Sequence, residues 1–239
     1  MTWLQICSSR PVDGSFDLMA PDPRDVDFDV AIPEALARLA RYTGHTRSGP
    51  YSIAQHSVIG ADAIFRRTND REAAACFLLH DAHEHVLGDK ATPIAEAEVA
   101  LAEQMMPGIG GQLVRAMQKA MKQRVDVAIY AAAGLGPDGC PLKYRPLVAE
   151  MDLAMLAAER RHLLGPKPKP WNPIVEAATP ARLLGRLRVW PWPEAADEFR
   201  ARVKAYLPDL GRPGRARPQP KPLPRKPPMA IATPQPVEA

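Results

Sequence analysis

Apolar residues recur every three or four positions along most of the chain, and this spacing places them on one face of a helix. Val58, Ala61 and Phe65 follow this rule, and Ser52 is a suitable N-cap for the helix that contains them. No stretch alternates apolar and polar residues for the length of a strand. The pattern therefore predicts helices over residues 34–42, 52–66, 71–87, 93–106, 111–133, 147–164, 181–187 and 194–207.

The first 33 residues lack this periodicity and are rich in proline and aspartate, so we expect turns and short strands there. Aromatic residues make up only 6% of the chain, which favours helices over sheets. Residues 1–207 are enough to enclose one hydrophobic core. The expected fold is all-α, with a single domain over residues 1–207 and a separate tail over residues 208–239.

The charge of the chain is unevenly distributed. The net charge is +4, but six basic and only two acidic residues lie between 208 and 239, so residues 1–207 are neutral. Ten of the 27 prolines fall in this same final segment. We expect residues 208–239 to be a disordered, polyproline-like tail that is either dispensable or binds an acidic partner. A neutral body gives no reason to expect a protein that binds nucleic acid.

The sequence also limits where the protein acts. No apolar run approaches the ~18 residues of a membrane-spanning helix. The N-terminal segment lacks the basic and apolar regions of a signal peptide. Cys7, Cys76 and Cys140 are widely spaced and odd in number, which suits a reducing compartment. These features predict a cytoplasmic protein without membrane association.

Five of the six histidines lie between residues 45 and 85. Within this region the apolar run 73–79 leads directly into His80 and Asp81. A buried imidazole or carboxylate without a partner is costly, because desolvation disfavours the charged form. A divalent cation, shared with His56 and with a carboxylate from a later helix, would offset that cost. Two imidazoles and two carboxylates suit Mn, Co, Fe, Ni or Zn, and suit Mg less well.

The alternative is a set of core histidines whose hydrogen bonds are satisfied locally. We favour the metal site, because a His-Asp pair directly after seven apolar residues is hard to explain by packing alone. His80 and Glu84 are four residues apart, so they would share one face of a continuous helix.

The chain resembles the HD-domain metal-dependent phosphohydrolases. The motifs that carry the resemblance are Arg41-Tyr42, His56, His80-Asp-Ala-His-Glu84 and Gly88-Asp-Lys-Ala-Thr-Pro93, in that order. Within that family, bacterial 5′-deoxynucleotidases and phage-type dATP triphosphohydrolases are the most similar, and the resemblance covers roughly residues 16–160. It implies an HD-domain helical bundle, a small nucleotide as substrate, and a homodimer.

The resemblance assigns one divalent metal ion to His56, His80, Asp81 and a distal aspartate. The candidates for this last ligand are Asp126, Asp138 and Asp152. We expect Asp152, because it lies in an otherwise apolar helical stretch, as the last ligand of the family does. Glu150, two residues earlier, points away from it and is expected to be solvated.

The resemblance also implies roles around the metal. Glu84 would orient or deprotonate the attacking water, and Asp89 would be a second acid–base group. Arg41 would hold the phosphate with its planar guanidinium. The other expected substrate contacts are Tyr42, His45, Lys90 and Thr92.

The chain departs from the family pattern at a few positions. Ala95 occupies a position where a basic residue usually follows the Thr-Pro pair, and Lys90 is the nearest substitute. His83 and His85 are additional to the motifs, and we expect them to be solvated or to support the ligands. The alternatives are a phosphate contact of His83 and a second metal ion.

The predicted function is hydrolysis of a phosphate ester or anhydride bond in a nucleotide. The enzyme would be a deoxynucleoside 5′-monophosphatase or a deoxynucleoside triphosphate triphosphohydrolase. One alternative is a phosphodiesterase acting on a cyclic or signalling nucleotide, although the extended motif of cyclic-dinucleotide enzymes is missing. The other is a catalytically silent HD module that binds nucleotide or metal, but such a module need not retain Glu84 and Asp89.

Overall fold

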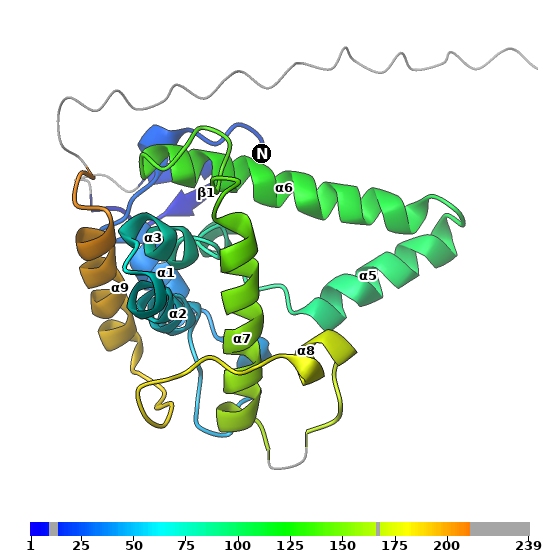
Figure 1. The fold of residues 1–239 in the computed structure, drawn as a ribbon. Coiled ribbons are helices and arrows are strands. Elements are labelled where there is room, and N and C mark those ends of the chain that lie inside the picture. Colours follow the sequence, from blue (N-terminus) through cyan, green and yellow to red (C-terminus); the bar gives the residue numbers. More distant parts are fainter. Residues whose placement is uncertain (10–13, 166–167, 211–239) are drawn as a thin grey trace, which may run out of the picture.

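The computed structural model describes residues 1–9, 14–165 and 168–210. Within these ranges the chain is mainly helical, which confirms the all-α prediction (Figure 1). The α-helices are α1 (Ala31–Arg38), α2 (Ile53–Thr68), α3 (Arg71–Leu78), α4 (Glu84–Leu87), α5 (Thr92–Met105), α6 (Gly110–Ala132), α7 (Arg145–Leu163), α8 (Pro173–Ala177) and α9 (Trp192–Tyr206). The other elements are the 3-10 helices η1 (Pro23–Asp25) and η2 (Arg41–Gly44) and the strands β1 (Trp3–Ile6) and β2 (Gly14–Asp17), which pair antiparallel.

Local sequence explains where the two central helices begin. The Ser52 side chain accepts a hydrogen bond from the Gln55 amide at 3.1 Å, so the predicted N-cap of α2 is confirmed. Asp70 does the same for α3 through the amide of Ala73, at 3.0 Å. Each cap satisfies an amide that the first turn of a helix leaves without a partner.

The hydrophobic core lies where α9 packs against α1, α2 and α3. Leu36, Ile64, Phe77 and Phe199 are all fully buried there. Helix α7 lies against α2 and α3 (Figure 1), so it can present polar side chains to their ends.

Helices α2 and α3 approach each other closely because α2 has a glycine at their contact. A Cβ atom added at Gly60 would lie only 2.1 Å from Cε1 of Phe77. Gly60 is one turn after His56, and Phe77 is three residues before His80. This contact therefore sets the distance between the two histidine-bearing segments.

We expect Gly60→Ala to lower the free energy of unfolding by about 1–3 kcal/mol, the usual cost of overpacking a core. Urea denaturation followed by circular dichroism would measure the change. Gly14→Ala is the matched control, because a Cβ there would make ordinary contacts of 3.5 Å or more. Equal stability of the two variants would contradict the close approach of α2 and α3.

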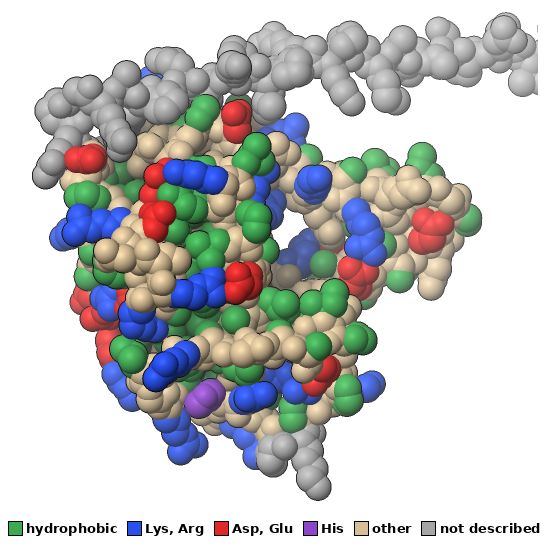
Figure 2. All heavy atoms as spheres, viewed as in Figure 1, with side chains coloured by type: hydrophobic (Ala, Val, Ile, Leu, Met, Phe, Trp, Pro, Cys, Tyr) green, Lys and Arg blue, Asp and Glu red, His purple; other side chains and the backbone are tan. Residues whose placement is uncertain are grey.

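Helices α5 and α6 form a hairpin that projects from the body of the molecule (Figure 1), and Figure 2 shows an opening between the hairpin and the body. Helix α5 packs mainly on α6. Large apolar side chains remain exposed on this hairpin: Leu101, Met105, Ile109, Leu113 and Met117.

The prediction of one helix over residues 71–87 is wrong. Helix α3 ends at Leu78, the chain passes through hydrogen-bonded turns, and α4 begins at Glu84. The carbonyl of Phe77 accepts hydrogen bonds from the backbone amide of His80 at 3.2 Å and from its ring Nδ1 at 2.6 Å. This carbonyl would otherwise accept the next helical hydrogen bond. His80 and Glu84 therefore do not share the face of a continuous helix.

The end of the first helix also differs from the prediction, which extended it to residue 42. Helix α1 ends at Arg38, because the chain becomes extended and Ala40 forms a β-bridge with Ser52. Tyr42 and Thr43 then adopt left-handed backbone conformations, with φ of 58° and 51°.

Residues 181–187 are not helical. Instead, the amide of Ala181 donates a hydrogen bond to the carbonyl of Ala154 on α7, at 2.9 Å, so a tertiary contact replaces the predicted helix. The short helix α8, which was not predicted, begins at Pro173 behind the N-cap Asn172.

In the described part of the chain, no helix is both long and apolar enough to cross a bilayer. The expectation for the tail concerns residues 208–239, and 211–239 of these lie outside the described residues.

Candidate metal centre

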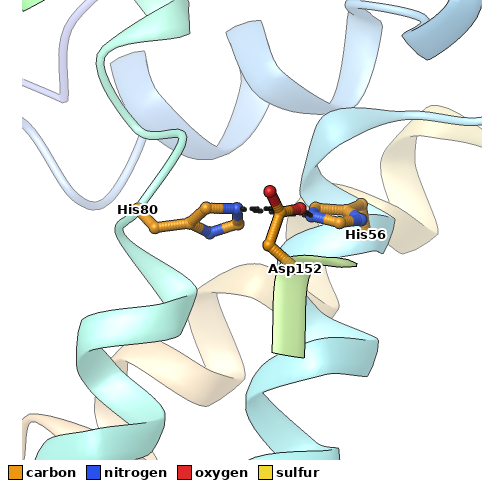
Figure 3. Close-up of side chains that lie close together, drawn as sticks. All are labelled: His56, His80 and Asp152. Atoms are coloured by element: carbon orange, nitrogen blue, oxygen red, sulfur yellow. Dashed lines mark hydrogen bonds and ion pairs between the residues drawn. The ribbon is translucent and has the colours of Figure 1, made fainter. Parts of the chain in front are cut away.

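Four predicted ligands come together from three parts of the fold: ligand atoms of His56, His80 and Asp152 lie within 4.8 Å of one another, and Asp81 contacts both histidines. His56 comes from α2, His80 and Asp81 from the turn after α3, and Asp152 from α7; Figure 3 shows the two histidines pointing toward the Asp152 carboxylate. The Nε2 atoms of His56 and His80 lie 3.3 and 3.6 Å from Oδ1 of Asp152. The same two atoms lie 3.8 and 3.1 Å from Oδ2 of Asp81.

The other nitrogen of each imidazole is engaged elsewhere. Nδ1 of His56 donates a hydrogen bond to Oε1 of Glu159 at 2.6 Å, and Nδ1 of His80 donates to the Phe77 carbonyl at 2.6 Å. These bonds place a proton on Nδ1 of both rings and leave both Nε2 atoms facing the shared centre. This is the usual arrangement behind histidines that bind metals.

Glu159 is the functional residue that our sequence reasoning missed. It is fully buried, and besides His56 it contacts the hydroxyl of Tyr42 at 2.6 Å and Nε of Arg41 at 3.3 Å. It follows Asp152 by seven residues, so both lie on the same face of α7. That spacing, together with the position of a carboxylate after two alanines, could have indicated a second buried acidic residue on this face of the helix.

The electrostatics of the cluster favour positive charge between its carboxylates. Burial opposes protonation of His80, but the Asp81 charge and hydrogen bonds to Asp152 and Asp81 outweigh it and raise the pKa of His80 to about 10. Burial would likewise raise the pKa of Asp152, yet the two histidines hold it well below its ordinary value. A divalent cation would supply the same compensation.

Arg41 lies beside the four ligands. Its Nη1 is 3.3 Å from Oδ2 of Asp81, while its Nε faces Glu159. Its side chain is only 14% exposed, so its charge acts in a poorly solvated environment.

Glu84 and Asp89 are half-buried next to the cluster. Burial, and then the negative charges of Asp81 and Asp89, raise the pKa of Glu84 to about 9. Burial also raises the pKa of Asp89, and Asp81 acts in the same direction. With a pKa of about 9, Glu84 holds a proton near neutral pH and can donate it.

The structure does not bring every expected substrate contact into this cluster. Lys90 is paired with Glu98 of α5 at 2.9 Å, Thr92 is the exposed first residue of α5, and His45 is exposed at the end of η2. Tyr42 does lie close, but its hydroxyl is engaged by Glu159. Glu150 is exposed and paired with Arg67 at 2.6 Å, as its predicted solvation requires.

His83 and His85 are not solvated. His85 donates from Nδ1 to the Ala82 carbonyl at 2.7 Å, and burial lowers its pKa to about 4. His83 is only 8% exposed and contacts two residues of α6, Lys122 at 3.0 Å and Asp126 at 3.2 Å. Asp126, one of the candidates for the distal ligand, therefore belongs to a neighbouring contact.

The residues fit a divalent cation. Four ligand atoms around one cation, each at about 2.1 Å, lie roughly 3.4 Å apart in a tetrahedral arrangement. The nitrogen–oxygen distances of 3.1 to 3.8 Å fall around that value. His56, His80, Asp81 and Asp152 are thus suited to hold an ion, with Glu159 fixing one of them.

The comparisons with known proteins do not indicate an activity for this chain. No protein-family model matches the chain. An uncharacterised protein of Rhodobacter capsulatus is 29% identical over 214 residues, which cover 87% of this chain and 97% of that protein. The chain is therefore similar to a protein of nearly the same extent, and its function has to be argued from the site.

Proposed function

We propose that the protein is an HD-domain phosphohydrolase that uses a divalent cation to hydrolyse the phosphate ester or anhydride bond of a small nucleotide. The observation that carries the proposal is the convergence of two imidazole Nε2 atoms and two carboxylates, with a guanidinium beside them. Mn, Co, Fe, Ni and Zn suit this donor set, and Mg is a weaker candidate. The substrate is a deoxynucleoside monophosphate or triphosphate.

Each residue near the centre has a chemical task in this proposal. A cation held by His56, His80, Asp81 and Asp152 would polarise a phosphoryl oxygen and lower the pKa of a bound water. Arg41 stabilises the negative charge of the phosphoryl group, because its guanidinium is fixed and poorly solvated. One carboxyl group of the pair Glu84 and Asp89 takes up the proton that the attacking water loses, and the other, in its protonated form, donates a proton to the leaving oxygen.

The proposal extends to assembly and location. Two copies pair through the α5–α6 hairpin, and the pairing buries the large apolar side chains that are exposed on the hairpin of a single copy. The enzyme acts in the cytoplasm, where nucleotides are abundant and the three free cysteines stay reduced.

A substrate screen tests the proposal. Purified protein loaded with Mn²⁺ or Co²⁺ is expected to release phosphate, pyrophosphate or triphosphate from a panel of deoxynucleoside mono- and triphosphates. Asp81→Ala and chelator-treated wild type should release none, because each lacks part of the metal centre. Turnover that survives chelation, or no turnover by protein with bound metal, would contradict the proposal; the second result would indicate a silent module.

A further inference from the structure

His83 is held at the edge of the metal centre by α6. A ring nitrogen of His83 lies within 4.8 Å of carboxylate oxygens of both Asp81 and Glu84. The imidazole is 8% exposed, so it is neither an ordinary surface side chain nor wholly enclosed. From the sequence, a phosphate contact of His83 was only an alternative to a solvated or supporting role, and the position of the ring beside the site now bears on that choice.

Lys122 determines which nitrogen of His83 carries the proton. The Lys122 ammonium lies 3.0 Å from Nδ1 of His83, and it also donates to the His80 carbonyl at 3.1 Å and to Asp126 at 2.9 Å. An ammonium can only donate, so Nδ1 accepts and the proton of the neutral ring is on Nε2.

The nearby carboxylate does not reverse this assignment. Oδ1 of Asp126 lies 3.2 Å from Nδ1 of His83, but it is buried and receives no hydrogen bond. Nδ1 of His83 therefore forms its hydrogen bond with Lys122 and not with Asp126. Within the described residues, no acceptor is hydrogen-bonded to Nε2 of His83.

We propose that His83 is a substrate-binding residue that donates a hydrogen bond from Nε2 to a phosphoryl oxygen. The inference rests on the proposed function and adds a second donor to the one that Arg41 supplies. The site has five carboxylates within or beside it, namely Asp81, Glu84, Asp89, Asp152 and Glu159. An anionic substrate entering this environment needs more donors than one arginine and a cation, and a neutral N–H group provides one.

Steady-state kinetics of metal-loaded protein tests the role. His83→Leu keeps much of the side-chain volume but removes the donor. It should lower kcat/KM for the best nucleotide by about 10- to 100-fold, the effect of losing a hydrogen bond to a charged group. His83→Gln, which retains an N–H group, should recover most of this loss. His162→Leu, at an exposed position near the end of α7, is the matched control and should equal wild type.

Titration of inorganic phosphate into Mn²⁺-loaded protein separates this inference from the proposed function. Phosphate should bind at least tenfold more weakly to His83→Leu than to wild type, even if no nucleotide is hydrolysed. Unchanged kinetics and phosphate affinity in His83→Leu would overturn the inference. So would loss of a bound metal ion from this variant, because His83 would then be a ligand, either of the proposed centre or of a second cation with Asp81 and Glu84.

Discussion

Replacing Asp152 with alanine is expected to reduce both bound metal and metal-dependent hydrolysis by more than about 100-fold. Loss of a residue that only orients a metal ligand typically costs roughly 10- to 100-fold, and loss of a ligand should exceed this. Asp152 is also the carboxylate that α7 contributes to both Nε2 atoms. Metal content by mass spectrometry and phosphate release by a colorimetric assay would measure the two effects.

Glu150→Ala is the control for this variant. Glu150 lies on the same helix, two residues earlier, and its only ion pair is with Arg67 within the described residues. We expect wild-type metal content and activity from it. If Asp152→Ala retains its metal while Asp126→Ala or Asp138→Ala loses it, the choice of distal ligand is wrong.

Glu159→Gln is expected to have the largest effect on stability. Glutamine keeps the shape of the side chain but removes the charge that faces Arg41 and His56, and neither partner can reach water easily. Removing one member of a buried ion pair costs about 3–5 kcal/mol of unfolding free energy. Metal affinity should also fall by up to roughly 10- to 100-fold, because an amide oxygen accepts the hydrogen bond from His56 more weakly than a carboxylate does. Urea denaturation and metal titration would measure these changes.

The difference in unfolding free energy between wild type and Glu159→Gln should also depend on pH. Burial would raise the pKa of Glu159, but the charges of Arg41 and His56 outweigh it and lower the pKa from 4.5 to about 2. The stabilisation is therefore fully present above pH 4.5 and is lost as the pH falls through about 2. The stabilities of wild type and Glu159→Gln should converge over that range.

Tyr42→Phe is the graded control, because it removes one hydrogen bond to Glu159 and no charge. We expect it to cost only about 1 kcal/mol. If Glu159→Gln were no more destabilising than Tyr42→Phe, the charge of Glu159 would have no structural role.

The sequence was sufficient to predict most of the long helices, and the family resemblance grouped the candidate ligands. His56 and His80 stand among apolar residues, so their burial and their need for a partner could be inferred, whereas the side chain of Asp152 is 44% exposed. The sequence reasoning did not consider Glu159, although it lies two turns after Asp152 on the same helix.

Other features depend on contacts that no local pattern contains. Helix α3 ends because the ring of His80 donates a hydrogen bond to the Phe77 carbonyl. The ring reaches that carbonyl only when its tertiary neighbours direct it inward. The extended course near Ala181 depends on α7 in the same way. His83 differs from a solvated histidine because Lys122 and Asp126, about 40 residues later on α6, lie against it.

The left-handed turn at Tyr42 and Thr43 has a mechanical consequence. Non-glycine residues held in such conformations store on the order of 1–3 kcal/mol each, and the surrounding structure has to maintain them. The hydrogen bond from Tyr42 to Glu159 is one restraint that does so. Glu159 also orients His56, so a single carboxylate both restrains the strained loop and holds the metal ligand in place. Loss of the Glu159 carboxylate would therefore relax the loop that carries Arg41 and, at the same time, free the ring of His56. The conformation of that loop and the position of the metal ligand depend on the same residue.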